Sequence, residues 1–266
     1  MTSMGKRSAP PVILAFGGFD PTGGAGVMMD SRAAAAAGAH ACAVSSCLTV
    51  QTAAAFSRFV AVPRDVMDES LSAAAETFRI GAVKVGMVGT RAAAEAILSF
   101  AAAHRGLPVV VDPVLRSSSG ALLLSPSALP AYRLLLRRAT VLTPNLPEAE
   151  KMLNRRIVSF SDAAAAAEEL SGLTGASVVL KGGHFPWKGR RGTDIVFTGG
   201  QTSLLPPVGG RRGDPHGTGC ALASAIAARI AGGDAVVPAV LAAKSILSKL
   251  VDGGFTPPEG RPILFP

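Results

Sequence analysis

The chain has 266 residues, of which 48% are hydrophobic, and a formal net charge of +8. A chain of this length can bury a full hydrophobic core, as one large α/β domain or as two small ones. Its basic residues are scattered as short pairs without interleaved aromatic residues, which argues against nucleic-acid binding. They are typical of an ordinary solvated surface, or of a field that steers small polyanions.

The three cysteines, Cys42, Cys47 and Cys220, are an odd number without the spacing of a zinc site. They indicate neither a disulfide framework nor a structural metal site, and they favour a reducing compartment. Residues 1–10 lack the apolar core of a secretory signal, and no apolar run could span a bilayer without glycine or charge. We therefore expect a cytoplasmic protein with no membrane partner. Residues 1–10 are expected to form a flexible tail before a single domain over residues 11–266.

Short apolar runs that end in glycine or polar residues alternate with helical stretches in the first half of the chain. Thr90 is placed to cap a helix, and Pro63 is placed to begin one. The predicted strands are residues 11–16, 40–48, 58–62, 82–86 and 108–111, and the predicted helices are residues 27–37, a stretch from 63 onward, and residues 91–104.

The second half continues the alternation and adds a hairpin around Gly199-Gly200. Strands that alternate with helices favour a mainly parallel sheet covered by helices on both faces. The predicted helices are residues 126–138, 149–153, 162–170, 219–230 and 235–250, and the predicted strands are residues 140–142, 177–180, 194–197 and 202–205.

Candidate site residues follow the predicted strands directly. In an open parallel sheet, ligands bind beyond the carboxyl ends of the strands, so we expect these residues to share one rim. They are Asp20, Gln51, Met87, Asp112, Asn145, Glu148 and Lys181.

The segment D-P-H-G-T-G-C, residues 214–220, leads into an apolar helix. The first N–H groups of a helix lack intrahelical partners, and the helix dipole adds partial positive charge there. Gly217 and Gly219 have no Cβ, and Thr218 offers a hydroxyl, so the segment predicts a cradle for phosphate or another oxyanion. Taken alone, it is equally compatible with a plain turn. The common nucleotide-binding signatures G-x-G-x-x-G and G-x-x-x-x-G-K-[ST] are not matched.

Six segments in order carry a resemblance: F-G-G-F-D-P-T-G-G-A-G-V-M-M-D from residue 16, K-V-G-M-V from 84, V-D-P-V from 111, L-T-P-N-L-P-E from 142, K-G-G-H from 181 and H-G-T-G-C from 216. The chain resembles the hydroxymethylpyrimidine and phosphomethylpyrimidine kinases of thiamin biosynthesis, in the ribokinase superfamily, over residues 11 to about 250. The resemblance implies a ribokinase-like three-layer α/β/α sandwich with a mainly parallel central sheet. It also implies ATP and Mg²⁺ as cofactors, a small pyrimidine as substrate and, commonly, a homodimer.

The resemblance also implies which residues line the pyrimidine pocket. An amide such as Gln51 can match the donor and acceptor of an aminopyrimidine, and Met87 and Val114 can supply apolar faces. Without the resemblance, Met87 is more often core filler, and Asp30 could be a solvated helix residue. The implied pocket residues are Gly18, Asp30, Gln51, Met87 and Val114.

For the phosphates, the resemblance assigns Asn145 and Glu148 to an N-x-x-E element that organises Mg²⁺ through water, with Asp112 near the same ions. Lys181 is suited to the nucleotide phosphates, and residues 217–220, with the Thr218 hydroxyl, correspond to the anion hole that stabilises the transferring phosphoryl group. The plainer alternatives are that Asn145 ends a turn, Glu148 favours a helix N-terminus and Lys181 is a surface lysine.

Cys220 stands where related sugar and pyridoxal kinases carry an aspartate that accepts the substrate hydroxyl proton. Because the thiol lies at a helix N-terminus, we expect its pKa to be lowered, so that a thiolate takes up that proton. Alternatively, Cys220 only shapes the pocket and the anion hole does most of the work.

The chain departs from the family pattern at Phe19, where a small hydroxyl residue is usual, and at Thr52, which replaces an asparagine. Asp214-Pro215 replaces an uncharged pair, and residues 185–193 match no family segment. The main hypothesis is an ATP-dependent kinase of 4-amino-5-hydroxymethyl-2-methylpyrimidine and its monophosphate. The alternatives are a pyridoxal or pyridoxine kinase and a non-catalytic pyrimidine-binding sensor.

Overall fold

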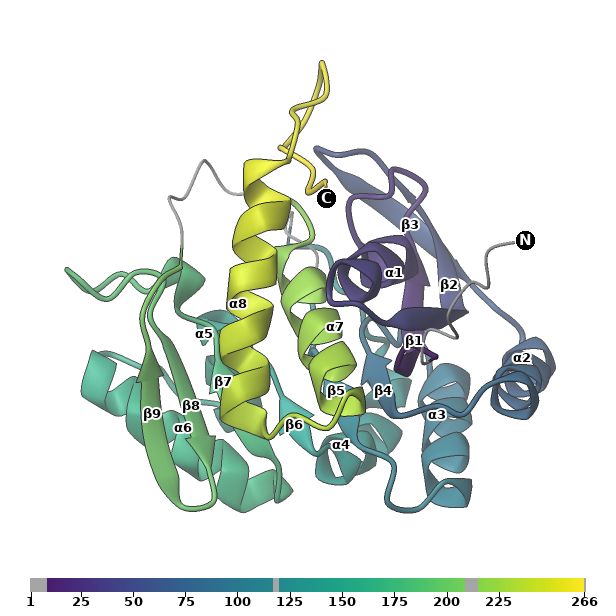
Figure 1. Cartoon of the computed structure of the whole chain (residues 1–266), viewed down its shortest axis with the longest axis horizontal. Helices are drawn as coiled ribbons and strands as arrows, with labels where there is room; N and C mark the ends of the chain where they lie inside the picture. Colours follow the sequence, from purple (N-terminus) through teal and green to yellow (C-terminus); the bar gives the residue numbers. More distant parts are fainter. Residues whose placement is uncertain (1–8, 117–119, 209–214, 266) are drawn as a thin grey trace, which may run out of the picture.

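The computed structural model describes residues 9–116, 120–208 and 215–265. The predicted N-terminal tail lies outside these ranges except for Ala9 and Pro10. The strands of the described ranges form one nine-stranded sheet in the order β3-β2-β1-β4-β5-β6-β7-β8-β9 (Figure 1). The neighbours from β2 to β7 run parallel, whereas β3, β8 and β9 pair antiparallel to their neighbours. The strands are β1 (Val12–Phe19), β2 (His40–Gln51), β3 (Phe56–Ala61), β4 (Ala82–Val85), β5 (Val109–Val111), β6 (Val141–Leu142), β7 (Ser177–Leu180), β8 (Asp194–Thr198) and β9 (Gln201–Leu205).

Helices cover both faces of this sheet, so the predicted three-layer α/β/α sandwich is confirmed (Figure 1). One face carries α1 (Gly26–Ala36), α7 (Thr218–Ala231) and α8 (Val236–Asp252). The other face carries α2 (Arg64–Thr77), α3 (Arg91–Ala103), α4 (Leu129–Arg138), α5 (Leu146–Leu153) and α6 (Phe160–Thr174). None of the described helices has the length and apolar character that crossing a bilayer requires.

The strands send alternate side chains into two separate cores. On β1, Leu14 and Phe16 join the cluster under α2 to α6, whereas Ile13 joins the cluster under α7 and α8. This alternation is the pattern of a sheet buried on both faces. The buried side of α7 is mostly alanine, with Ala221, Ala223 and other alanines fully buried, so the helix can pack closely over the central strands.

Side chains cap the starts of α3, α5 and α6, and the first two caps bear on the predicted helix bounds. The Thr90 side chain accepts a hydrogen bond from the Ala93 N–H (3.2 Å) at the start of α3, which confirms the predicted cap. Helix α5 begins at Leu146, three residues earlier than the apolar pattern predicts. It does so because Asn145 and Glu148 cap each other across its first turn.

The segment 185–193, which matched no family segment, packs on the start of α6. The rings of Phe185 and Trp187 lie 5.1 Å apart and both contact Phe160, and the Arg190 guanidinium lies 4.4 Å from the Phe160 ring centroid. The Trp187 indole N–H donates to the Val158 carbonyl (3.2 Å). These contacts give the segment a packing role.

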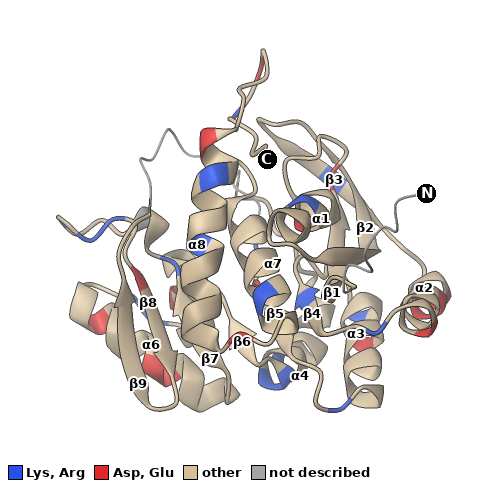
Figure 2. Cartoon of the chain, in the orientation of Figure 1, with Lys and Arg blue, Asp and Glu red and all other residues tan. Residues whose placement is uncertain are grey.

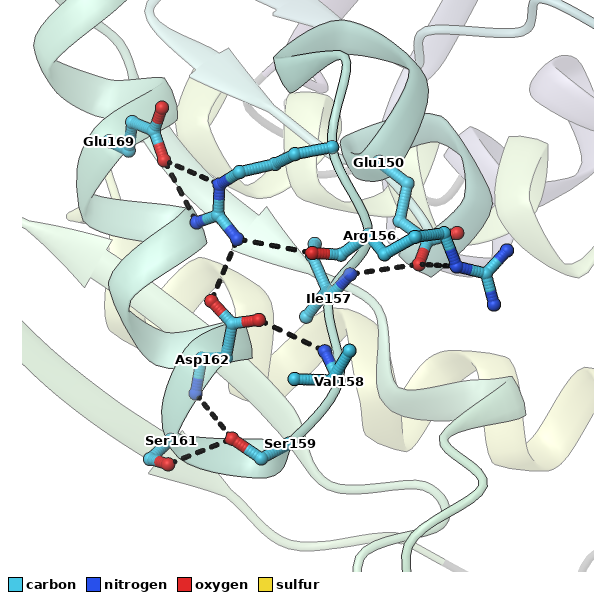
Figure 3. A network of polar contacts seen from close by, with 9 residues as sticks. Glu150, Arg156, Ile157, Val158, Ser159, Ser161, Asp162 and Glu169 are labelled. Carbon is cyan, nitrogen blue, oxygen red and sulfur yellow. Dashed lines mark hydrogen bonds and ion pairs between the residues drawn. The ribbon is translucent and has the colours of Figure 1, made fainter.

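The connection between α5 and α6 is held by a polar network (Figure 3). The backbone of Asn154 is left-handed, with φ 51°. The next residue, Arg155, donates to Glu169 (2.9 Å) and to Asp162 (2.8 Å) on α6. Because Asp162 also accepts the Val158 N–H (2.9 Å), the network ties both helices to the turn between them.

A C-terminal segment returns to the glycine-rich cradle segment. The His216 N–H donates to the Pro262 carbonyl (2.8 Å), and residue 263 pairs with both His216 and Phe255. The Arg261 N–H donates to the Ala53 carbonyl (3.3 Å) in the loop after β2. Two loops of the rim are therefore fixed by residues near the end of the chain.

Candidate active site

A cleft of about 1500 Å³ opens at the carboxyl ends of the parallel strands. Loops that follow β1, β2, β4, β5 and β7 meet there with the first turns of α5 and α7, as the order of strands and helices requires. Most predicted site residues line this one cleft: Gly18, Gln51, Met87, Asp112, Val114, Asn145, Glu148, Lys181, Gly217, Thr218, Gly219 and Cys220.

Two of the family departures can also be placed. Phe19 is half-buried at the end of β1 and is not among the residues that line the cleft. Thr52 does line the cleft, beside Gln51. Asp214 lies outside the described residues.

Lys181 lies between two carboxylates. Its Nζ donates to Asp112 Oδ1 (2.6 Å) and lies 3.7 Å from Glu148 Oε2. Burial acts to lower the pKa of Lys181, but the charges of Asp112 and Glu148 outweigh it and raise the pKa above its usual range. The ammonium therefore stays charged at the centre of the cleft.

Asn145 and Glu148 form a capping box and line the cleft at the same time. Asn145 Oδ1 accepts the Glu148 N–H (2.9 Å), and Glu148 Oε2 accepts the Asn145 N–H (2.7 Å). The plainer alternative, that these residues shape a helix start, is thus also realised. Burial and the nearby Asp112 raise the pKa of Glu148, while Lys181 opposes the shift. Like the Lys181 ammonium, a bound cation would favour the ionised form of Glu148 and lower its pKa.

The oxygens of Asp112, Asn145 and Glu148 fit a magnesium ion that keeps part of its water shell. Hard cations take oxygen ligands, and Mg²⁺ is usually held by one or two carboxylates together with water and substrate phosphates. Within the described ranges there is no group of three or more His, Cys, Asp or Glu side chains that could enclose a metal. The donor set therefore suits an ion shared with a phosphate rather than a protein cage.

The cradle lies against this charged group. Gly217 precedes α7 with φ 85°, and no side chain caps the helix, so the first N–H groups of α7 have no partner from a cap. A Cβ on Gly217 would collide with the Gly24 carbonyl, and a Cβ on Gly219 would lie 3.3 Å from both Lys181 Nζ and Asp112 Oδ2. Bare backbone at these positions lets the cradle, the ammonium and the carboxylate approach one anion.

The expected lowering of the Cys220 pKa is wrong. Burial raises the pKa of the thiol to about 11, and Asp30 and Asp112 add to the rise. The Lys84 ammonium and the Gly26 N–H lower it, but by less. Desolvation of this partly buried thiol outweighs the effect of the helix N-terminus, so the thiol is protonated at neutral pH.

Asp30 does not line the cleft, contrary to the prediction. It is fully buried beneath it, where its Oδ1 accepts from Lys84 Nζ (2.7 Å) and from the Ser224 hydroxyl (2.8 Å). Lys84 is itself fully buried, yet it is one of the lining residues. Lys84 was not among the predicted site residues, although a lysine inside the apolar strand A-V-K-V was a usable signal. An unpaired buried charge is too costly, so such a lysine requires a partner.

Asp20 organises the glycine loop between β1 and α1. Its carboxylate accepts from the N–H groups of Thr22 and Ala25 (both 2.9 Å), and His216 Nε2 lies 3.4 Å away. Burial acts to raise the pKa of Asp20, but its polar contacts with His216, Gln51 and Thr22 outweigh it and lower the pKa to about 2. The loop and the cradle segment are thereby joined through one carboxylate.

The depressed pKa of Asp20 predicts acid sensitivity. A carboxyl whose pKa is lowered by folding stabilises the protein above its unfolded pKa, near 3.8, and loses that contribution as pH falls toward 2. Between pH 5 and pH 3 the loss from Asp20 should be about 1 kcal/mol, because the unfolded carboxyl takes up its proton over this interval while the folded carboxyl stays mostly ionised. Urea unfolding at both pH values should show a smaller decrease for Asp20→Asn than for the wild type. Equal decreases would contradict the assignment.

Comparison with known proteins gives a consistent match. The family model described as phosphomethylpyrimidine kinase matches residues 20–262. The hydroxymethylpyrimidine/phosphomethylpyrimidine kinase of Rhizobium meliloti is 37% identical over 240 residues, which cover 89% of this chain and 88% of that protein. The corresponding protein of Aquifex aeolicus is 32% identical, over 90% of this chain and 94% of that protein. The chain spans only 31% of the thiamine biosynthesis multifunctional protein ThiED of Corynebacterium efficiens, at 33% identity over 87% of this chain.

Solved structures share the fold. The phosphomethylpyrimidine kinase of Clostridium difficile superposes with a TM-score of 0.77 and 28% identity, covering 89% of this chain and 97% of that chain. The pyridoxal kinase of Staphylococcus aureus in complex with ADP gives a TM-score of 0.85 and 24% identity, covering 97% of this chain and 94% of that chain. The chain therefore belongs to the phosphomethylpyrimidine kinase family and has the ribokinase-like fold that the sequence predicted.

Proposed function

We propose that this chain is an ATP-dependent kinase that phosphorylates the hydroxymethyl group of 4-amino-5-hydroxymethyl-2-methylpyrimidine, and then the monophosphate to the diphosphate, in thiamin biosynthesis. The observation that carries the proposal is the meeting of Lys181, Asp112 and the uncapped N-terminus of α7 at Gly219. Positive charge and backbone N–H groups at one point are what a transferring phosphoryl group requires.

The substrate ring is proposed to lie against the part of the cleft formed by Gly18, Gln51, Met87 and Val114. Gln51 can donate to a ring nitrogen and accept from the amino group, and Met87 and Val114 offer apolar contact. Asp30 acts only through Lys84, because it does not reach the cleft surface.

Phosphoryl transfer then forms a bond between the substrate alcohol oxygen and the γ-phosphorus of ATP and breaks the bond to the β-phosphate oxygen, releasing ADP. Lys181 and the N–H groups of the cradle, with the Thr218 hydroxyl, stabilise the phosphoryl oxygens. Mg²⁺, when held through Asp112, Asn145 and Glu148, neutralises charge on the ATP phosphates. Because the transition state is loose, positioning and charge stabilisation supply most of the catalysis.

The alcohol must also lose its proton. Cys220 is proposed to receive it as the thiolate, a minor form that the neighbouring Lys84 ammonium favours. The carboxylates of Asp30 and Asp112 oppose that form. Cys220 would therefore act through its thiolate, which is a strong base but makes up only a small fraction of the side chain at neutral pH.

Incubation of the protein with Mg-ATP and the aminopyrimidine, followed by mass spectrometry, tests the function. We expect the monophosphate first and the diphosphate later. A competition assay with pyridoxal checks specificity, because faster turnover of pyridoxal would favour a pyridoxal kinase. Binding of the aminopyrimidine without ADP release would instead favour a non-catalytic sensor and contradict the kinase assignment.

We further propose that the enzyme is a homodimer that acts in the cytoplasm. The family resemblance supports the dimer. Among the described residues all three cysteines are free thiols, which agrees with a reducing compartment. Sedimentation velocity would reveal the oligomer, and a monomer at micromolar concentration would contradict the dimer.

A further inference from the structure

The cleft extends beyond the residues used above into an arm between α4 and α5 that ends on α6. We call it the α4–α5 arm. Figure 1 shows these three helices together on one face of the sheet. The proposed phosphoryl transfer uses none of the side chains of this arm. Its lining includes Tyr132, Arg133, Leu136, Arg137, Lys151 and Leu170.

Three cations line the arm. Arg133, Arg137 and Lys151 are exposed, and each lacks an ion pair or side-chain hydrogen bond to any described residue. The acidic residues that line the whole cleft are Asp20, Asp112 and Glu148, which belong to the site of phosphoryl transfer. In Figure 2 the arginines of α4 appear as blue segments of the helix. Like charges facing one cavity raise its affinity for an anion.

The wall of the arm is apolar and carries one unused hydrogen-bond donor. Leu170 is 1% exposed and Leu136 is 9% exposed. The Tyr132 hydroxyl is buried, and no described residue partners it. Burial, together with Glu148 and Asp112, raises the pKa of Tyr132, so the hydroxyl keeps its proton. A buried donor without a partner is costly, and a bound acceptor would remove that cost.

The far side of the arm is fixed in place. Asn154 lines the arm and has a left-handed backbone directly after α5. Arg155 ties the following turn to α6 through Asp162 and Glu169, which are labelled in Figure 3. A wall held in this way does not need to reorganise when a ligand binds, which favours affinity.

We propose that the α4–α5 arm is a second binding site, which holds an organic phosphate with its apolar portion against Leu136 and Leu170 and its phosphate at Arg133, Arg137 and Lys151. This inference goes beyond the proposed function. A ligand bound there shares the cleft with the phosphoryl-transfer site while contacting different side chains.

The test uses 1-naphthyl phosphate as probe and isothermal titration calorimetry on the full chain. The double variant Arg133→Ala, Arg137→Ala should bind the probe about tenfold more weakly than the wild type, because charged hydrogen bonds to the phosphate are lost. The control is Arg79→Ala, Arg105→Ala, which removes two exposed arginines that do not line the cleft and lowers the net charge equally. The control should stay within about twofold, since only long-range attraction changes.

Two further variants locate the probe. Tyr132→Phe should weaken binding several-fold, since it removes only the unpartnered hydroxyl. Lys181→Met should leave binding in the arm within about twofold, because Lys181 is not part of the arm's lining. Equal affinity of the wild type and the Arg133, Arg137 double variant for the probe would overturn the proposal. The proposal would also be overturned if the wild type bound no detectable probe, or if only Lys181→Met lost binding. None of these readouts depends on kinase turnover, so failure here is distinct from failure of the proposed function.

Discussion

Lys181→Met is expected to lower the rate of phosphoryl transfer by roughly a thousandfold, the upper part of the range for losing one preorganised group in an anion hole. The methionine keeps the approximate volume but removes the charge between Asp112 and Glu148. Two buried carboxylates would then face the ATP phosphates without the ammonium. The KM for ATP should rise as well, because the same charge acts on bound nucleotide. Steady-state kinetics with Mg-ATP and the aminopyrimidine measures both effects.

Lys188→Met is the matched control, because Lys188 is exposed in the segment that packs on α6 and does not line the cleft. Its turnover should stay close to that of the wild type. Thermal unfolding of both variants separates a loss of chemistry from a loss of fold. Turnover of folded Lys181→Met within tenfold of the wild type would contradict the central position assigned to this ammonium.

Cys220→Ala is expected to reduce turnover by about a hundredfold or more while leaving the affinity for the pyrimidine within a few fold, as for loss of a general base. The pH dependence gives a sharper test. Since burial holds the pKa of Cys220 at about 11, the thiolate fraction rises about tenfold per pH unit between pH 7 and pH 9. The wild-type rate should rise with pH over this interval wherever proton removal limits it.

In Cys220→Ala this rise should be absent. Cys220→Asp is the informative companion variant, because a carboxylate at this position could accept the proton in place of the thiolate. It should recover part of the activity with a flatter pH profile, since a carboxylate is already ionised at neutral pH. Near-normal turnover of Cys220→Ala would contradict the proposal that Cys220 is the general base. Catalysis would then depend on the cradle and Lys181.

The rim of the sheet could be predicted because strand ends are visible in the sequence. Apolar runs followed by Asp112 or Lys181 mark both the strand and its carboxyl end, and parallel strands place those ends together. The cap at Thr90 was equally accessible, because it depends on residues a few positions apart.

The burial of Asp30 could not be predicted from the local sequence pattern. A polar residue on α1 can face water, the cleft or the sheet, and its burial follows from Lys84 on β4, 54 positions away. The predicted lowering of the Cys220 pKa was wrong for a related reason. The position at a helix N-terminus can be seen in the local sequence, whereas the desolvation of the thiol depends on the tertiary structure. The α4–α5 arm was not predicted either, because it depends on how far apart two helices pack.

The C-terminal return to His216 constrains the order of events during synthesis. The cradle at the start of α7 receives its backbone partner from residue 262, and the loop after β2 receives one from residue 261. Translation therefore has to deliver residues 261 and 262 outside the ribosomal tunnel before the site can adopt its final geometry, although the central strands can pair earlier. A nascent chain that had not yet exposed residue 261 could hold a nearly complete sheet and still lack the final geometry of the anion site.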